Sequence, residues 1–248
     1  GGSASDESMS ISAGLCLAKD LEKTSKEYFF DNKNIKIDTL YLGPKAELNE
    51  EKIALKNLDE NLYNISNDNS PFKIANLLSK GFILARCAGE MEFGQRALGN
   101  RSIIADPKNM EVKDKINSAI KNRDFWMPFA PIILDTYSHK YLVNPKNIYS
   151  PHMTIGFDTT NLGFESMRAA CHPADKSARP QILRKEINQE LYQILLEFER
   201  LTKRGALLNT SFNLHGYPIV NTPKEAVEVL HNSGLDGLIL NNYLIIKN

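Results

Sequence analysis

The sequence contains few cysteines and no excess of charge of either sign. Its three cysteines, Cys16, Cys87 and Cys171, lie far apart and form no CxxC pair, which argues against a disulfide framework and a zinc ribbon. A reducing, cytoplasmic setting fits this usage best. The 30 basic and 30 acidic residues give a formal net charge of +0, whereas proteins that bind nucleic acid through bulk charge carry a basic excess. We therefore expect no nucleic-acid partner.

Long apolar runs and closely spaced histidines are absent as well. No run approaches the roughly 18 apolar residues that a membrane-spanning helix needs. The opening GGSASDESMS has neither the basic nor the apolar region of a signal peptide, so we expect no membrane partner. The five histidines, at positions 139, 152, 172, 215 and 231, show no HxxxH or HxE spacing, which argues against a complete metal site within this chain.

The apolar residues, 42% of the chain, are distributed over two parts. Residues 6–22 have apolar side chains at helical spacing and predict a helix. A polar stretch follows, with a turn predicted at 41–44 and a linker at 64–71. After this linker, helix and strand patterns alternate, which is typical of an α/β domain. We therefore divide the chain into residues 1–70 and 71–248.

The second part contains the clearest secondary-structure patterns. Apolar stripes, with Pro, Asn, Thr or Gly at their ends, predict helices at 71–81, 111–121, 187–201 and 221–234. Short apolar runs between turn residues predict strands at 82–88, 102–107, 130–134, 152–158, 178–183, 205–212 and 237–247.

The stretch GEMEFGQRALGNRS (89–102) is the first candidate site. Arg96 and Arg101 are five residues apart, beside glycines that permit tight turns. Guanidinium groups bind phosphate through a forked set of donors, but a surface loop with two solvated arginines has the same composition. In a phosphate-binding loop, Glu90 and Glu92 would orient the arginines through carboxylate–guanidinium contacts.

A second pair of cations lies at the end of a predicted amphipathic helix. Lys121 and Arg123 come just before the apolar turn 125–129. Basic residues are common at this end of a helix because they face its negative dipole. Beside an apolar wall, however, cations also bind an anionic ligand more strongly.

The stretch CHPADKSARPQ places several polar side chains at the entry to a predicted strand. Cys171 and His172 are a poor nucleophile–base pair, because neighbours in an extended chain point to opposite faces. Asp175 and Ser177 follow, and Arg179 is the better candidate as a phosphate ligand.

A fourth polar cluster lies where the predicted strand 205–212 ends. Asn209, Thr210, Ser211 and Asn213 occupy this end. Their hydroxyl and amide groups could bind phosphate, ribose or a small amide, although the same residue types are common in β-turns.

Together these segments resemble the C-terminal part of the NodU/CmcH carbamoyltransferase family. The resemblance covers roughly residues 75–245 and is carried, in order, by GEMEFGQRALGNRSIIADP, INSAIKNRDFWMPFAP, SARPQ and LLNTSFNLHGYPIVNTPKEAVEVL. It implies a YrdC-like α/β fold, in which helices flank a twisted mixed β-sheet. It also implies an ATP-dependent O-carbamoyltransferase, which uses Mg²⁺ and carbamoyl phosphate to form carbamoyladenylate and passes the carbamoyl group to a hydroxyl group.

The resemblance implies a partner domain as well. In this family an actin-like ATPase-superfamily domain precedes the YrdC-like domain, and residues 3–18 resemble its last helix. Asp6 then falls where the family supplies a metal-ligating aspartate. We therefore expect this chain to be the carbamoyl-activating piece of a longer protein, with residues 1–70 as the remnant of a missing N-terminal domain that holds a divalent metal such as iron.

The resemblance gives the candidate residues their roles. Lys121, Arg123 and Arg179 would form the catalytic set by neutralising the phosphates of carbamoyl phosphate and ATP. Ser211 and Asn213 match the family's Ser-x-Asn pair and would bind the nucleotide. The other implied substrate or nucleotide contacts are Arg96, Asn100, Arg101, His172, Asp175, Ser177 and Asn209.

Three points stay open. Many family members carry Arg where this chain has Met127. The same fold also serves synthesis of threonylcarbamoyladenylate from threonine and bicarbonate, and a piece of the protein could bind nucleotide without turnover. The identity of the acceptor alcohol is not encoded in these segments.

Overall fold

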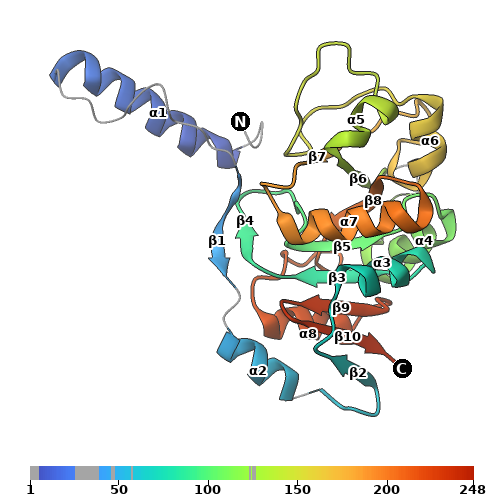
Figure 1. Cartoon of the computed structure of the whole chain (residues 1–248). Coiled ribbons are helices and arrows are strands. Elements are labelled where there is room, and N and C mark those ends of the chain that lie inside the picture. The colour runs from blue at the N-terminus through green and yellow to red at the C-terminus, as the bar shows by residue number, and fades with distance from the viewer. Residues whose placement is uncertain (1–5, 26–38, 46–47, 57, 123, 125–126) are drawn as a thin grey trace.

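The computed structural model describes residues 6–25, 39–45, 48–56, 58–122, 124 and 127–248. Its centre is an eight-stranded sheet in the order β2-β10-β9-β3-β5-β8-β6-β7, and a two-stranded sheet, β1-β4, lies beside it (Figure 1). The strands are β1 (Tyr41–Lys45), β2 (Tyr63–Ser66), β3 (Leu84–Cys87), β4 (Glu90–Glu92), β5 (Arg101–Ala105), β6 (Ala130–Leu134), β7 (Gln181–Leu183), β8 (Ala206–Ser211), β9 (Gly237–Leu240) and β10 (Tyr243–Lys247).

The main sheet is mixed, as the family resemblance implied. β3 runs parallel to β9 and β6 runs parallel to β7, whereas the other neighbours are antiparallel. Every residue of β3, β5, β6, β7 and β9 is buried. Near-continuous apolar runs are the pattern of strands covered on both faces, which explains why these strands were predictable.

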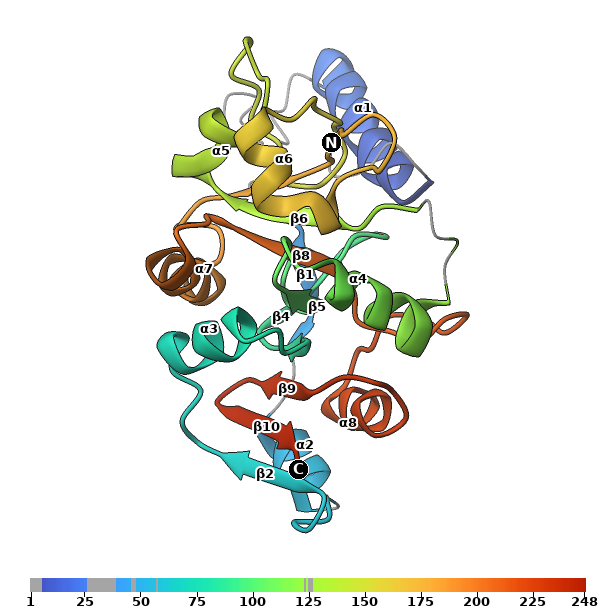
Figure 2. The ribbon, with the colours of Figure 1, turned by 90° about the vertical axis from the view of Figure 1, so that its right-hand side faces the viewer.

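Helices cover both faces of the sheet. They are α1 (Asp6–Ser25), α2 (Leu48–Lys56), α3 (Pro71–Ser79), α4 (Met110–Ile116), α5 (Asp135–Tyr141), α6 (Asn161–Met167), α7 (Gln189–Thr202) and α8 (Pro223–His231), with a π-helical turn η1 (Asn117–Lys121) and a 3₁₀ turn η2 (Arg168–Ala170). Seen edge-on in Figure 2, α3 and α7 lie on one side and α4 and α8 on the other.

Successive residues of a strand point alternately into two hydrophobic cores, one on each face of the sheet. In β3, Ala85 joins the core under α4 and α8, whereas Leu84 joins the core under α3 and α7. In β5, Ile103 and Ile104 divide in the same way. This alternation follows from the two-residue repeat of a strand, so each helix layer packs on its own set of side chains.

The predicted helix ends have the expected capping contacts. The side chain of Asn188 accepts a hydrogen bond from the Leu191 N–H and caps α7. Thr222 and Glu225 form a reciprocal capping box at the start of α8, with Pro223 in the first turn. The helices α7 and α8 therefore begin at positions fixed by the sequence.

Four local predictions were wrong. Residues 152–158 form no strand and pair only through an isolated bridge at Phe157. The expected turn at 41–44 is strand β1. The single strand expected at 237–247 is the hairpin β9–β10, since Asn241 adopts a left-handed conformation and reverses the chain. Part of the expected linker at 64–71 is β2, which pairs with β10 at the sheet edge.

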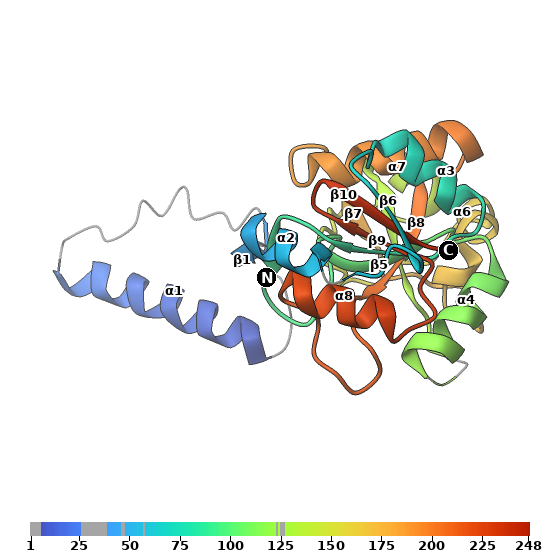
Figure 3. The same cartoon turned by 90° about the horizontal axis from the view of Figure 1, so that it is seen from below.

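The predicted N-terminal helix is present and lies apart from the sheet. Figures 1 and 3 show α1 projecting away from the main body, and its apolar residues Met9, Leu15 and Leu17 are exposed. No helix among the described residues is both long and apolar enough to cross a bilayer. The division of the chain at residue 70 stays a prediction.

Candidate active site

The loop 89–102 is held rigidly by its own carboxylate. One oxygen of Glu92, a buried residue, accepts hydrogen bonds from the backbone N–H groups of Leu98, Asn100 and Arg101, at 2.7, 2.7 and 3.2 Å. The expectation that Glu92 would pair with an arginine is therefore wrong. The acceptor is needed because a tight loop leaves several N–H groups without a backbone partner.

The glycines of this loop are used as predicted. Gly94 and Gly99 have φ values of +95° and +115°, a region that residues with a Cβ atom rarely adopt. A Cβ atom at Gly99 would also overlap the side chain of Leu191 on α7. The loop can therefore lie against α7 only with glycine at this position.

Arg101 does not face a ligand cleft. Its side chain is fully buried, and its guanidinium group donates only to carbonyl oxygens. The five acceptors are those of Pro44, Ala88, Gly89, Asn100 and Asn221, at 3.1–3.5 Å. In this conformation it joins β1 and the approach to α8 to the loop and cannot reach a phosphate, contrary to the role that the resemblance implied.

Arg96, only five residues earlier, lines an open cleft. Two adjoining hollows of about 80 and 400 Å³ share Pro128, Phe129 and Arg179, and we call them together the arginine cleft. Its polar lining residues include six predicted ones: Arg96, His172, Ser177, Arg179, Asn209 and Ser211. The structure therefore brings together polar side chains from three separate sequence motifs, and Pro128 and Phe129 add a fourth.

The arginine cleft combines two cations with a buried amide in its wall. Arg179 is exposed and Arg96 is half-buried. Asn209 is buried, and its Nδ2 donates to the carbonyl of Ala97 at 2.7 Å. This bond fixes the orientation of the amide, and Oδ1 has no hydrogen-bond partner among the described residues. A buried acceptor without a donor is costly, so the geometry favours a ligand with an N–H or O–H group here.

The side chain of Lys121 forms hydrogen bonds with the Ser-x-Asn turn, residues 211–213. Lys121 ends the π-helical turn η1, a distortion often found at functional sites, and it is buried. Its Nζ donates to the carbonyl and side-chain oxygens of both Ser211 and Asn213, at 2.6–3.1 Å. Lys121 therefore orients the turn, on which Ser211 lines the cleft. Arg123 lies outside the described residues.

His172, Asp175 and Ser177 form one polar turn at the cleft edge. The Ser177 N–H donates to Asp175 Oδ1 at 2.8 Å, and His172 Nδ1 lies 3.2 Å from the same oxygen. Hydrogen bonds from Ser177, with the nearby His172, lower the pKa of the Asp175 carboxyl below its ordinary value. Asp175 itself does not line the cleft but positions the two residues that do.

Cys171 has the chemistry of a core residue. It is buried, and burial raises the pKa of its thiol to about 12. A thiol with such a pKa carries almost no thiolate at neutral pH. The prediction that Cys171 is not a nucleophile therefore agrees with its environment.

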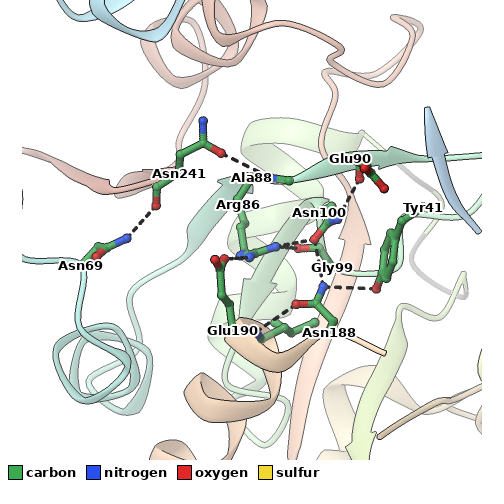
Figure 4. Close-up of polar contacts among 12 residues, drawn as sticks. Tyr41, Asn69, Arg86, Ala88, Glu90, Gly99, Asn100, Asn188, Glu190 and Asn241 are labelled. Carbon is green, nitrogen blue, oxygen red and sulfur yellow. Dashed lines mark hydrogen bonds and ion pairs between the residues drawn. The ribbon is translucent and has the colours of Figure 1, made fainter. Parts of the chain in front are cut away.

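Asn100 and an unpredicted arginine lie on the other side of the loop. Arg86, on β3, is buried and donates to Gly99 O at 2.9 Å, to Asn100 Oδ1 at 2.6 Å and to Glu190 at 2.6 Å (Figure 4). Its position in the apolar run FILARCA was the available signal, because a charge in a buried strand needs a specific partner.

The expected metal ligand cannot be placed. Asp6 is the first residue of α1, and its side chain lies outside the described part of the chain. Within the described part, no three His, Cys, Asp or Glu side chains are grouped so as to hold a metal ion. The expected Mg²⁺ and the divalent metal of a preceding domain stay predictions.

The fold and the cleft define a class: an α/β domain with a cationic, amide-containing cleft at the end of strand β8. Comparison with known families is more specific. The chain belongs to the carbamoyltransferase C-terminus family, whose sequence pattern matches residues 75–247. The family resemblance read from the four motifs is thereby confirmed.

Curated relatives cover most of this chain. An uncharacterized protein of Methanocaldococcus jannaschii is 37% identical over 94% of the chain and 44% of its own length. The nodulation protein NolNO of Sinorhizobium fredii is 35% identical over 73% of the chain and 26% of its own length. The 3'-hydroxymethylcephem-O-carbamoyltransferase of Amycolatopsis lactamdurans is 28% identical over 68% of the chain and 31% of its own length. The chain thus spans less than half of each relative.

A solved structure supports the fold. The crystal structure of full-length HypF in its phosphate- and nucleotide-bound form superposes with a TM-score of 0.51 at 15% identity, over 75% of this chain and 22% of that one. The similarity shows that the two chains share a fold, and the family membership shows that this one is a carbamoyltransferase domain.

Proposed function

We infer that this chain is the carbamoyl-activating part of an ATP-dependent O-carbamoyltransferase. The observation that carries this is the arginine cleft, where Arg96 and Arg179 lie beside the unpaired acceptor of Asn209. Carbamoyl phosphate has the matching groups, because its phosphate is an anion and its amide is a donor. The hydroxyl acceptor and the remainder of the reaction belong to the longer protein that the relatives' lengths suggest.

The reaction sequence balances as follows. Water releases phosphate from carbamoyl phosphate and leaves carbamate. A carbamate oxygen then attacks the α-phosphorus of ATP, whose bond to the leaving pyrophosphate breaks, and carbamoyladenylate forms. An acceptor hydroxyl finally attacks the carbamoyl carbon, loses its proton, and displaces AMP. Mg²⁺ would offset the charge of the ATP phosphates during the second step.

Four residues of the cleft, together with Lys121, have a part in this reaction sequence. Arg179 and Arg96 neutralise charge on the transferred phosphate groups, which is the main requirement of phosphoryl and nucleotidyl transfer. Asn209 accepts from the carbamoyl –NH₂. Lys121 keeps Ser211 in place through its bonds to the Ser-x-Asn turn, and we assign it a positioning role. Met127, where many relatives carry Arg, lines the same cleft beside Arg179, so Arg179 supplies the cation there.

Pyrophosphate release tests the proposal. Supplied with carbamoyl phosphate, ATP and Mg²⁺, the chain should release pyrophosphate, and Lys121→Ala should abolish the release. Lys108→Ala is the matched control, since Lys108 is exposed and outside the cleft. Full activity in Lys121→Ala would refute the site. Pyrophosphate release from ATP with threonine and bicarbonate in place of carbamoyl phosphate would instead indicate a threonylcarbamoyladenylate synthase. ATP binding without turnover would indicate a non-catalytic module.

A further inference from the structure

A second, larger cavity lies on the opposite side of the loop 89–102. It has a volume of about 700 Å³, within the range of small-molecule sites, and we call it the Arg86 cavity. Asn100 lines it from the loop, Asn188 and Glu190 from the start of α7, and Lys45 from β1. None of its lining residues lines the arginine cleft.

The cavity contains a buried cation whose counter-ion is exposed. The Arg86 side chain is 2% exposed, whereas that of its partner Glu190 is 76% exposed. A buried guanidinium group must keep an anion beside it, because an unpaired buried charge is strongly destabilising. An exposed glutamate, by contrast, can turn into solvent at little cost. A ligand anion could therefore take the place of the Glu190 carboxylate on Arg86.

The wall around this cation is rich in amides. Asn100 and Asn188 are already bonded to each other and to Arg86 or Tyr41 (Figure 4), which fixes the base of the cavity. Other amide side chains of the lining have no hydrogen bond among the described residues. They are Gln189, Gln193 and Asn242. Each amide offers both donors and an acceptor, the groups that recognise a hydroxyl.

We propose that the Arg86 cavity is a second ligand site that binds a small hydroxyl-bearing anion, of the sugar phosphate or sugar acid class. The anion lies on Arg86 in place of Glu190, with Lys45 at the rim, and the hydroxyl groups bind the amide side chains of the wall. The site is separate from the arginine cleft, with which it shares no lining residue.

Glu190→Gln gives the sharpest test, because it removes the internal competitor from an exposed position without touching the buried arginine. Glu186→Gln is the matched control, an exposed glutamate just before α7 that does not line the cavity. The probes are glucose 6-phosphate and gluconate. Glucose and inorganic phosphate test the sugar and the anion separately. Binding is measured by thermal unfolding and by calorimetric titration, both at constant ionic strength.

In the absence of anions, we expect Glu190→Gln to have a lower melting temperature than Glu186→Gln. Glucose 6-phosphate or gluconate should raise the melting temperature of Glu190→Gln until this difference disappears. Its affinity for the effective probe should exceed the wild-type affinity by about tenfold, the effect of removing one exposed competing carboxylate. Gln193→Ala should weaken the sugar anion but not inorganic phosphate. Both glutamate variants retain the arginine cleft, so anion binding there contributes equally to both and cancels when the two are compared. Identical responses of the two variants to both sugar anions would overturn the proposal.

Discussion

Four arginines lie in or beside the loop 89–102, and they differ in their exposure. Arg96 and Arg179 reach an open cleft, whereas Arg86 and Arg101 are buried. Arg101 donates to carbonyl oxygens from distant segments, and Arg86 has one carboxylate as an exchangeable partner. The difference lies in the partners that the fold supplies, because all four side chains have the same chemistry.

The contrast within the motif FGQRALGNRS is instructive. Arg96 and Arg101 are five residues apart, yet only Arg96 can contact a substrate as the chain stands. A buried guanidinium group that donates to carbonyl oxygens joins segments of the fold, whereas one that lines an open cleft can bind an anion. The predictions below separate these two uses, from the largest expected effect to the smallest.

Arg101→Ala should be the most destabilising of the arginine changes. It removes hydrogen bonds to five carbonyl oxygens and leaves a cavity, so we expect a loss of about 3 kcal/mol or more in the free energy of unfolding. Arg96→Ala, in the same loop, should change the free energy of unfolding by less than about 0.5 kcal/mol. Urea unfolding measures both. Equal losses would show that burial does not distinguish the two arginines.

Gly99→Ala should destabilise through the contact between the loop and α7. It combines a positive φ with overlap against Leu191. Gly216→Ala is the control, since Gly216 also has a positive φ but open space around it. We expect Gly99→Ala to cost about 2 kcal/mol more than the control in urea unfolding. A smaller difference would mean that the loop moves away from α7 easily.

Arg179→Gln should reduce the use of carbamoyl phosphate as a substrate. It removes a charge-assisted contact to the phosphate, so the KM for carbamoyl phosphate should rise roughly 10- to 100-fold. Arg184→Gln is the control, because Arg184 stacks on Tyr149 outside the cleft. Steady-state pyrophosphate release gives both constants, and an unchanged KM would remove Arg179 from the site.

Tyr41→Phe should give the smallest effect, on the buried side of the loop. The Tyr41 hydroxyl donates to Leu98 O at 2.7 Å and accepts from Asn188, so its removal should cost about 1 kcal/mol. Burial raises the pKa of Tyr41 to about 12. Its contribution is thus complete below about pH 10, where the unfolded chain titrates, and is lost as the pH rises towards 12.

Denaturant unfolding of wild type and Tyr41→Phe between pH 8 and about 11 measures this difference. The gap between the two proteins should narrow as the pH rises. A gap that widens over this range would contradict the assignment of a neutral, buried hydroxyl at position 41.

Much of the fold could be predicted because its signals are local. The stripe of α7 and the capping box of Thr222 and Glu225 lie within a few residues. β2 could not be predicted, because a polar edge strand acquires its partner, β10, from the far end of the chain. Residues 152–158 alternate like a strand, but they pair only through an isolated bridge between Phe157 and Ala178.

The same limit applies to the site. Arg96, Arg179 and Ser211, which come from separate motifs, line one cleft in the structure, and their binding roles stay predictions. The motifs could not separate Arg101 from Arg96, because two of the five carbonyl acceptors of Arg101 come from distant residues, Pro44 and Asn221. Arg86 was missed because its counter-ion lies 104 residues away.

The central claim is that accessible arginines, and not buried ones, bind the substrate phosphate. Isothermal titration of carbamoyl phosphate into wild type, the Arg96→Gln/Arg179→Gln double variant and Arg184→Gln tests it most directly. Binding should be lost in the double variant, with its far-ultraviolet circular dichroism still that of a folded protein, and should be retained in Arg184→Gln. Wild-type affinity in the double variant would contradict the account.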